Sequence, residues 1–190
     1  YHVTTNTGIT REYKALASLG PAFFGPPQPD HGFWPNAANF SQNKIPSLEH
    51  WIGSGVDNTH NPRTFQHENG RVVAMNMTSN EQSNNISQIV PTDWLGSFPR
   101  LKTFVVDGIP IRFESFPDTL PNTLTNLALR GAIFGPQLYS TIPHSIGQHT
   151  NLVRLTVHGL LQGHIPTEIG NLVQLQTLRL SDSSLDGPIP

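Results

Sequence analysis

A short apolar pattern recurs five times in this 190-residue chain and constrains its fold more than any other feature. Each copy has an apolar residue, a second three positions later and a third two positions after that, as in Leu175, Leu178 and Leu180. The copies begin at Val72, Leu101, Leu124, Leu152 and Leu175, with spacings of 29, 23, 28 and 23 residues. Copies in one register, with insertions only between them, predict a solenoid of repeated units.

The end of each copy alternates between apolar and polar residues, which is the period of a β-strand. A single strand has too little apolar surface to be stable alone, so neighbouring units must stack and share a core. We therefore expect an α/β solenoid with one parallel strand per repeat and an irregular or 3-10 convex side. The apolar residues of successive copies should form ladders through its interior.

The last copy lies in "LQGHIPTEIGNLVQLQTLRLSDSSLDGPIP", which contains Ile-Pro twice. This stretch resembles the plant-type extracellular leucine-rich repeat, whose signature is Leu-x-Gly-x-Ile-Pro-x-x-Ile-Gly-Asn-Leu. The segment "STIPHSIGQHTNL" (140–152) is similar, with His149 where a Leu is expected. The resemblance implies a second, short strand before each Ile-Pro, where the proline ends backbone pairing.

The chain departs from this family in the turn after the inner strand. The family usually has an Asn three residues after that strand, and its side chain satisfies backbone groups there. The sequence has other residues at most of these positions, so we expect irregular turns. The positions are Asn80 (or Asn84), Ile109, Ala132, Leu160 and Ser183.

Residues 1–70 show no repeat, but they contain a possible short amphipathic helix at 11–25 and many aromatic residues. Their order resembles the N-terminal cap of extracellular repeats, here without cysteine as in bacterial, protist or algal relatives. A disordered tail and a carbohydrate-binding aromatic platform are the alternatives. The predicted organisation is a cap over 1–70 and about five repeats over 71–190, with further repeats beyond 190.

Composition excludes several classes of function. A net charge of −2 leaves no basic face for nucleic acid, and no apolar run is long enough to span a membrane. The absence of cysteine excludes disulfides and thiolate chemistry. The nine histidines lack metal-ligand spacing, and no nucleotide or hydrolase motif is present. We therefore predict no enzyme activity, no metal and no cofactor.

The candidate site is the concave face that the outward-pointing strand residues would form. Three arginines fall at such positions in the last three strands and could bind an acidic protein or an anionic glycan. Simple solvation of these residues is the equally weighted alternative. The predicted ligand-binding residues are Arg130, Arg154, Thr156, His158, Arg179 and Ser181, and the predicted glycosylation sites are Asn39, Asn76 and Asn85.

These features favour a non-catalytic extracellular or cell-surface protein that binds a protein or glycan. The resemblance implies either a receptor-like ectodomain or an inhibitor of a wall-degrading enzyme. A structural glycoprotein of a filament or matrix is the alternative, with self-assembly through the solenoid ends. The expected exposed end carries Leu178, Leu180, Leu185 and Ile189. Ice binding is disfavoured, because it needs a regular array of threonines.

Overall fold

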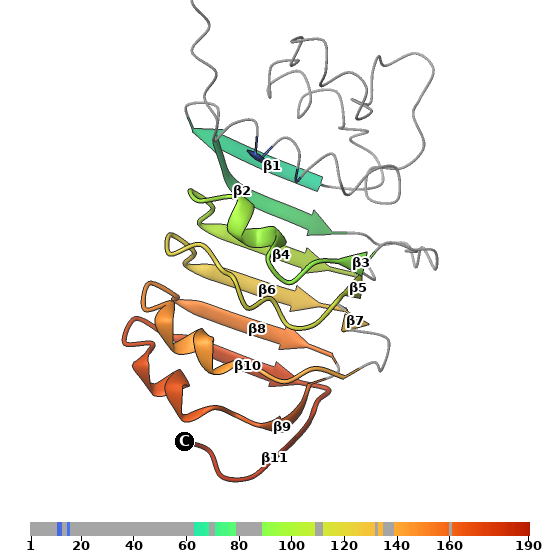
Figure 1. Ribbon diagram of the computed structural model, residues 1–190, viewed down its shortest axis with the longest axis vertical. Coiled ribbons are helices and arrows are strands. Elements are labelled where there is room, and N and C mark those ends of the chain that lie inside the picture. The colour runs from blue at the N-terminus through green and yellow to red at the C-terminus, as the bar shows by residue number, and fades with distance from the viewer. Residues whose placement is uncertain are drawn as a thin grey trace, which may run out of the picture.

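The computed structural model describes residues 11–12, 15, 63–68, 71–78, 89–108, 112–131, 133–134, 139–159 and 161–190. These residues form a stack of layers whose principal sheet runs from one end to the other (Figure 1). Within the sheet β1 and β2 are antiparallel, whereas every later neighbour is parallel. In spatial order its strands are β1 (Arg63–Glu68), β2 (Arg71–Thr78), β4 (Thr103–Asp107), β6 (Asn126–Arg130), β8 (Arg154–His158) and β10 (Thr177–Ser181).

The opposite side of the stack consists of short elements. Two small parallel sheets are formed by β3 (Ile89–Val90), β5 (Arg112–Phe113) and β7 (Ile133–Phe134), and by β9 (Gln162–His164) and β11 (Ser184–Asp186). The 3-10 helices are η2 (Trp94–Ser97), η3 (His144–Gln148) and η4 (Thr167–Asn171). The predicted solenoid, with one parallel strand per repeat and a 3-10 convex side, is confirmed.

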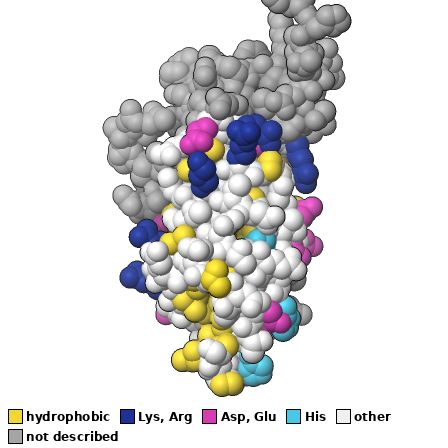
Figure 2. Space-filling model, turned by 90° about the vertical axis from the view of Figure 1, so that its left-hand side faces the viewer, with side chains coloured by type: hydrophobic (Ala, Val, Ile, Leu, Met, Phe, Trp, Pro, Cys, Tyr) yellow, Lys and Arg dark blue, Asp and Glu magenta, His cyan; other side chains and the backbone are white. Residues whose placement is uncertain are grey.

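The interior is built from ladders that the strand register aligns. One ladder runs through Met75, Phe104, Leu127, Leu155 and Leu178, and its neighbour through Met77, Val106, Leu129, Val157 and Leu180. Every member on β2 to β8 is buried, whereas the two on β10 are partly exposed. Figure 2 shows hydrophobic side chains gathered at the lower end of the stack, where β10 and β11 lie. Each layer is therefore covered by the next one.

Aromatic side chains fill the second layer. The Trp94 ring lies edge-on to Phe98, with ring centroids 4.8 Å apart, and 6.0 Å from Phe104. Phe104 in turn contacts Phe113 at 6.5 Å in a T-shaped arrangement. Such pairs add to the stabilisation that burial of their large apolar area already gives. These rings connect the principal sheet to the short elements across the core.

The turns after β4, β6, β8 and β10 each begin with a residue in the left-handed region. Gly108, Gly131 and Gly159 directly follow β4, β6 and β8 with φ of 69°, 80° and 139°, and Asp182 follows β10 with φ of 51°. Glycine reaches these values without the clash that a Cβ would cause. Of the expected turn positions, 80, 84, 109, 132 and 160 lie outside the described residues. Ser183 hydrogen-bonds through its hydroxyl to the carbonyl oxygens of Gly159 and Ser181.

The start of the chain contacts the first layers at two points. The Glu12 carboxylate is buried and forms an ion pair with the Arg71 guanidinium, whose Nε donates to it at 2.8 Å. It also accepts a hydrogen bond from the Val72 amide at 3.1 Å. The Trp94 indole N–H donates to the carbonyl of Ala15 at 2.9 Å. The rest of the predicted helix at 11–25 lies outside the described residues.

Replacing Phe104 by alanine should destabilise the whole stack. The side chain is 1% exposed and contacts two other aromatic rings, so the substitution should reduce the free energy of unfolding by about 3–5 kcal/mol. Val105→Ala is the matched control, since this neighbour lies half-exposed on the outer side of the same strand and should cost less than about 1 kcal/mol. Urea unfolding followed by circular dichroism measures both; equal losses would contradict the layered core.

Candidate functional site

The outward-pointing residues of the principal sheet form a surface that we call the outer sheet face. Parallel register aligns them in three rows along the stack. The first row is Ala74, Thr103, Asn126, Arg154 and Thr177; the second is Asn76, Val105, Ala128, Thr156 and Arg179; the third is Asp107, Arg130, His158 and Ser181. On β2, β4 and β6 the described residues of these rows are buried or half-buried, whereas the exposed members are Arg154, His158, Arg179 and Ser181 on β8 and β10.

The three arginines predicted for this face lie in three different rows. Arg154 lies in the first row, Arg179 in the second and Arg130 in the third. A parallel ladder aligns only residues at the same strand position, and these arginines occur at different positions of their strands. The three arginines therefore share one face of the sheet but do not form a continuous row.

Arg130 is already paired within the protein. Its guanidinium Nη1 lies 2.7 Å from Oδ2 of Asp107, which is the neighbouring residue of the third row. His158, in the same row, hydrogen-bonds through Nε2 to the carboxylate of Asp182. Arg130 and His158 thus both have acidic partners, which reduces their attraction for an external anion.

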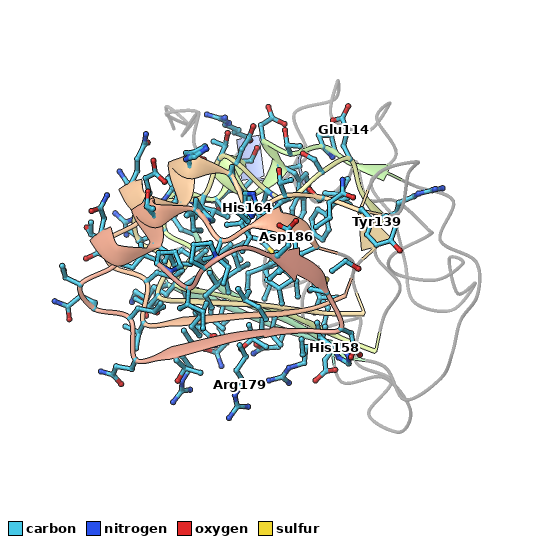
Figure 3. The ribbon with its side chains drawn as sticks, turned by 90° about the horizontal axis from the view of Figure 1, so that it is seen from below. Glu114, Tyr139, His158, His164, Arg179 and Asp186 are labelled. Atoms are coloured by element: carbon cyan, nitrogen blue, oxygen red, sulfur yellow. The ribbon has the colours of Figure 1, made fainter. Side chains whose placement is uncertain are left out.

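Arg154 and Arg179 differ from Arg130 in this respect. Both side chains are exposed, and neither forms an ion pair with any residue that the structure describes. Figure 3 shows Arg179 projecting away from the coil on the same side as His158. Thr177 and Thr156 lie opposite the two arginines in the β8–β10 register. The neighbouring strands β8 and β10 therefore each present one arginine without an acidic partner among the described residues.

The remaining predicted site residues contribute unequally. Thr156 is only 9% exposed, so its hydroxyl offers little surface to a ligand, whereas Ser181 is exposed. Asn76 is half-buried on β2 in the second row. Asn39 and Asn85 lie outside the described residues. The exposed part of the predicted site is thus concentrated on β8 and β10.

Three histidines bind carboxylates of the following repeat, an arrangement that sequence reasoning missed. His144 Nδ1 lies 2.8 Å from Oε2 of Glu168, and His164 Nδ1 lies 2.7 Å from Oδ1 of Asp186 (Figure 3). His158 and Asp182 form the third pair. The signal was the sequence separation of 24, 22 and 24 residues, which is about one repeat. Residues one repeat apart occupy adjacent layers and can meet across the stack.

The first of these pairs changes the titration of its acid. The hydrogen bond from the His144 ring contributes most to lowering the pKa of Glu168 below its usual value, and the backbone amide of Glu168 itself comes next. The charge of His144 and the hydroxyl of Thr167 contribute less. Because the carboxylate faces solvent, its contribution to stability is small. Among the described residues, no three His, Asp or Glu side chains gather closely enough to hold a metal ion.

Comparison with known proteins gives matches at the level of structure only. No sequence model of a protein family matches the chain, and no curated protein matches its sequence. The ectodomain of the Arabidopsis thaliana receptor kinase GASSHO1/SCHENGEN3, solved with CASPARIAN STRIP INTEGRITY FACTOR 2, is similar over 95% of the chain, with a TM-score of 0.60 and 24% identity. The chain spans 19% of the length of that ectodomain.

Two shorter Arabidopsis structures are also similar. The BIR3–SERK2 complex matches 93% of the chain with a TM-score of 0.63 and 19% identity, and the chain covers 84% of the matched protein. The BIR2 ectodomain matches 94% with a TM-score of 0.57 and 14% identity, and 83% of it is covered. The chain has the leucine-rich-repeat fold. At these identities the likeness extends to architecture and not to particular ligands. None of the helices in the described ranges is long and apolar enough to cross a membrane.

His149, which replaces an expected leucine, should make the leucine-rich-repeat core sensitive to acid. Its side chain is 7% exposed, its Nδ1 finds no hydrogen-bond partner among the described residues, and burial lowers its pKa. As the pH falls through about 6.5, the ordinary pKa of histidine, this residue takes up a proton in the unfolded chain but resists it in the folded protein. The free energy of unfolding therefore decreases.

The variant His149→Leu should increase the free energy of unfolding by about 1–3 kcal/mol at pH 7, with a larger gain at pH 5. Urea unfolding across this range measures the difference between the two proteins. His144→Gln serves as the control, because this exposed histidine should not reproduce the gain. A constant difference between pH 7 and pH 5 would show that His149 stays accessible to protons.

Proposed function

We propose that this protein is a non-catalytic binding protein of the cell exterior, and that it holds an anionic protein or glycan on β8 and β10 of the outer sheet face. The supporting observation is the pair Arg154 and Arg179, which are exposed and have no ionic partner among the described residues. Arginine presents donors in a planar fork that fits carboxylate and sulfate groups. The hydroxyl groups of Thr177 and Ser181 provide neutral donors beside them.

The extracellular part of this proposal draws on the architecture. Two of the similar structures are ectodomains, and this chain shares their fold. The Ile-Pro elements of the last repeats suggest the plant-type subtype, whose short second strand is expected directly before Ile-Pro. In this chain β9 ends directly before Ile165-Pro166. Glycans at Asn39, Asn76 and Asn85 would accord with this location. Asn76 lies three strands from β8, roughly 14 Å at about 4.8 Å per strand, so its glycan would leave the two arginines accessible.

We also propose the division into a cap over residues 1–70, lacking cysteine, and repeats over 71–190. The contacts of Glu12 with Arg71 and Val72, and of Ala15 with Trp94, support this arrangement. A cap in this position would cover an end of the stack that would otherwise expose apolar side chains. This is the physical role of a cap in a repeat protein.

Binding should depend on Arg154 and Arg179 and not on the paired Arg130. Polygalacturonate and poly-L-glutamate are suitable probes for the two ligand classes, and isothermal titration calorimetry at low and moderate salt measures their affinity. Each of the substitutions Arg154→Ala and Arg179→Ala should lower the affinity for the probe that binds by roughly tenfold, which corresponds to about 1.4 kcal/mol of binding free energy. Added salt should reduce the affinity, because exposed charges are screened.

The matched control is Arg130→Ala, which removes the same charge from the same face. Because Asp107 already neutralises Arg130, this variant should lose much less affinity than the other two. Equal losses in all three variants would show that only net charge matters. Absence of binding by both probes in the intact protein would remove the anionic ligand from the proposal.

A further inference from the structure

The turn after β10 contains a residue that differs from its counterparts in the earlier layers. The strand register places Asp182 in line with the glycines that follow β4, β6 and β8, which are Gly108, Gly131 and Gly159. In the part of the chain that the structure describes, Asp182 is the only non-glycine residue with positive φ. A Cβ added to Gly131 would meet nothing closer than 3.9 Å, so the backbone conformation, and not lack of space, favours glycine in these turns.

The carboxylate of Asp182 contacts the preceding layer. It hydrogen-bonds to Nε2 of His158, the last residue of β8. The two side chains are 48% exposed for His158 and 75% exposed for Asp182, so their contact lies in solvent and adds little to stability. Residues held in the left-handed region despite its cost occur often where function requires them. The charge of Asp182, and not its packing, therefore distinguishes it from glycine.

The charged groups around this pair come from four strands of the outer sheet face. They are Asp107 on β4, Arg130 on β6, Arg154 on β8 and Arg179 on β10. Arg130 lies beside His158 in the register, but its charge is offset by Asp107. The two arginines of the proposed binding site therefore decide the local balance together with His158 and Asp182.

This balance changes with the protonation of one group. When His158 is neutral, the negative charge of Asp182 opposes the two positive charges of Arg154 and Arg179. When His158 is protonated, it cancels the charge of Asp182 and leaves both arginines uncompensated. Imidazole is the side chain whose charge ordinarily changes between pH 5 and 8. The net positive charge of the site is thus larger in mild acid.

His158 is close enough to Arg179 for this change to reach a bound anion. It lies opposite Ser181, two residues beyond Arg179 on the same face, which corresponds to roughly 8 Å between Cα atoms. Figure 3 shows both side chains on the same side of the coil. This separation is shorter than the Debye length of about 10 Å at 0.1 M salt, so the charges are only partly screened from one another.

We propose that His158 and Asp182 make anion binding on β8 and β10 dependent on pH. At neutral pH the Asp182 carboxylate repels an anion that approaches Arg179, and in mild acid protonated His158 neutralises this carboxylate. The proposal rests on the binding function proposed above and adds its regulation. The expected ligand is an anionic polymer whose own charge persists in mild acid.

Calorimetric titration with dextran sulfate at pH 7.5 and pH 5.5 tests this regulation. The sulfate groups stay ionised at both values, so a change in affinity comes from the protein. In low salt the affinity should rise by about two- to fivefold at pH 5.5, as expected for one exposed charge at this separation. His158→Gln should abolish most of this rise, because glutamine can donate to Asp182 but cannot take up the proton.

The variant Asp182→Gly provides the complementary test. It removes the repelling carboxylate and restores the residue that the three earlier turns have. Its affinity at pH 7.5 should therefore increase to about that of the unmodified protein at pH 5.5. Because glycine suits a φ of 51° and the lost contact is exposed, Tm should change by no more than about 2 °C.

His144→Gln is the matched control. His144 forms the same kind of pair with Glu168, but between η3 and η4 on the opposite side of the stack. This variant should keep the full rise in affinity at pH 5.5. Circular dichroism at both pH values verifies that each variant is folded, since buried His149 lowers stability in acid.

The outcomes separate this regulation from the binding function itself. No binding of the anion at either pH would overturn the proposed function and the regulation with it. Binding that is equally tight at both pH values, or a rise that persists in His158→Gln, would overturn only the regulation. A loss of more than about 5 °C in the Tm of Asp182→Gly, without tighter binding at pH 7.5, would make Asp182 a purely structural residue and would also overturn it.

Discussion

The structure depends on the burial of each layer's apolar side chains by the next layer. A single turn of this coil has five strand residues and a few short elements, too little to bury a core of its own. Stability therefore arises between repeats, as in the ladder from Met75 through Leu127 to Leu155. The same requirement explains the buried aromatic rings of the second layer and the partial exposure of Leu178 on β10.

Because packing fixes the inner side of every strand, the outer side is free to vary. The parallel register then determines which outer residues become neighbours, and it pairs Asp107 with Arg130 while leaving Arg154 and Arg179 apart from any described acid. A charge is available to a ligand only where its own neighbours leave it uncompensated. The proposed binding site thus depends on the strand register, which is set by the packing of the inner side chains.

The histidine–carboxylate pairs show the same effect of stacking on polar residues. His144 and Glu168 are far apart in sequence, yet they meet because one full repeat separates them. Such exposed pairs contribute little energy individually, but they mark the joint between the last two layers at several places around the coil. His149 has the opposite character, since it is buried at an apolar position, its Nδ1 has no hydrogen-bond partner among the described residues, and burial lowers its pKa.

The sequence alone determined the fold class, the strand of each repeat and the ladder residues, because an apolar period repeated in register has few physical solutions. It also identified the outward-pointing residues, including Arg154 and Arg179, from strand alternation. It could not determine which aligned outer residues form ion pairs, because an ion pair depends on the distance between two side chains and not only on their strand positions. Only the tertiary structure decided that Asp107 neutralises Arg130 and that His144 meets Glu168 of the next layer. Both facts depend on distances between layers, and the linear order of residues does not contain them.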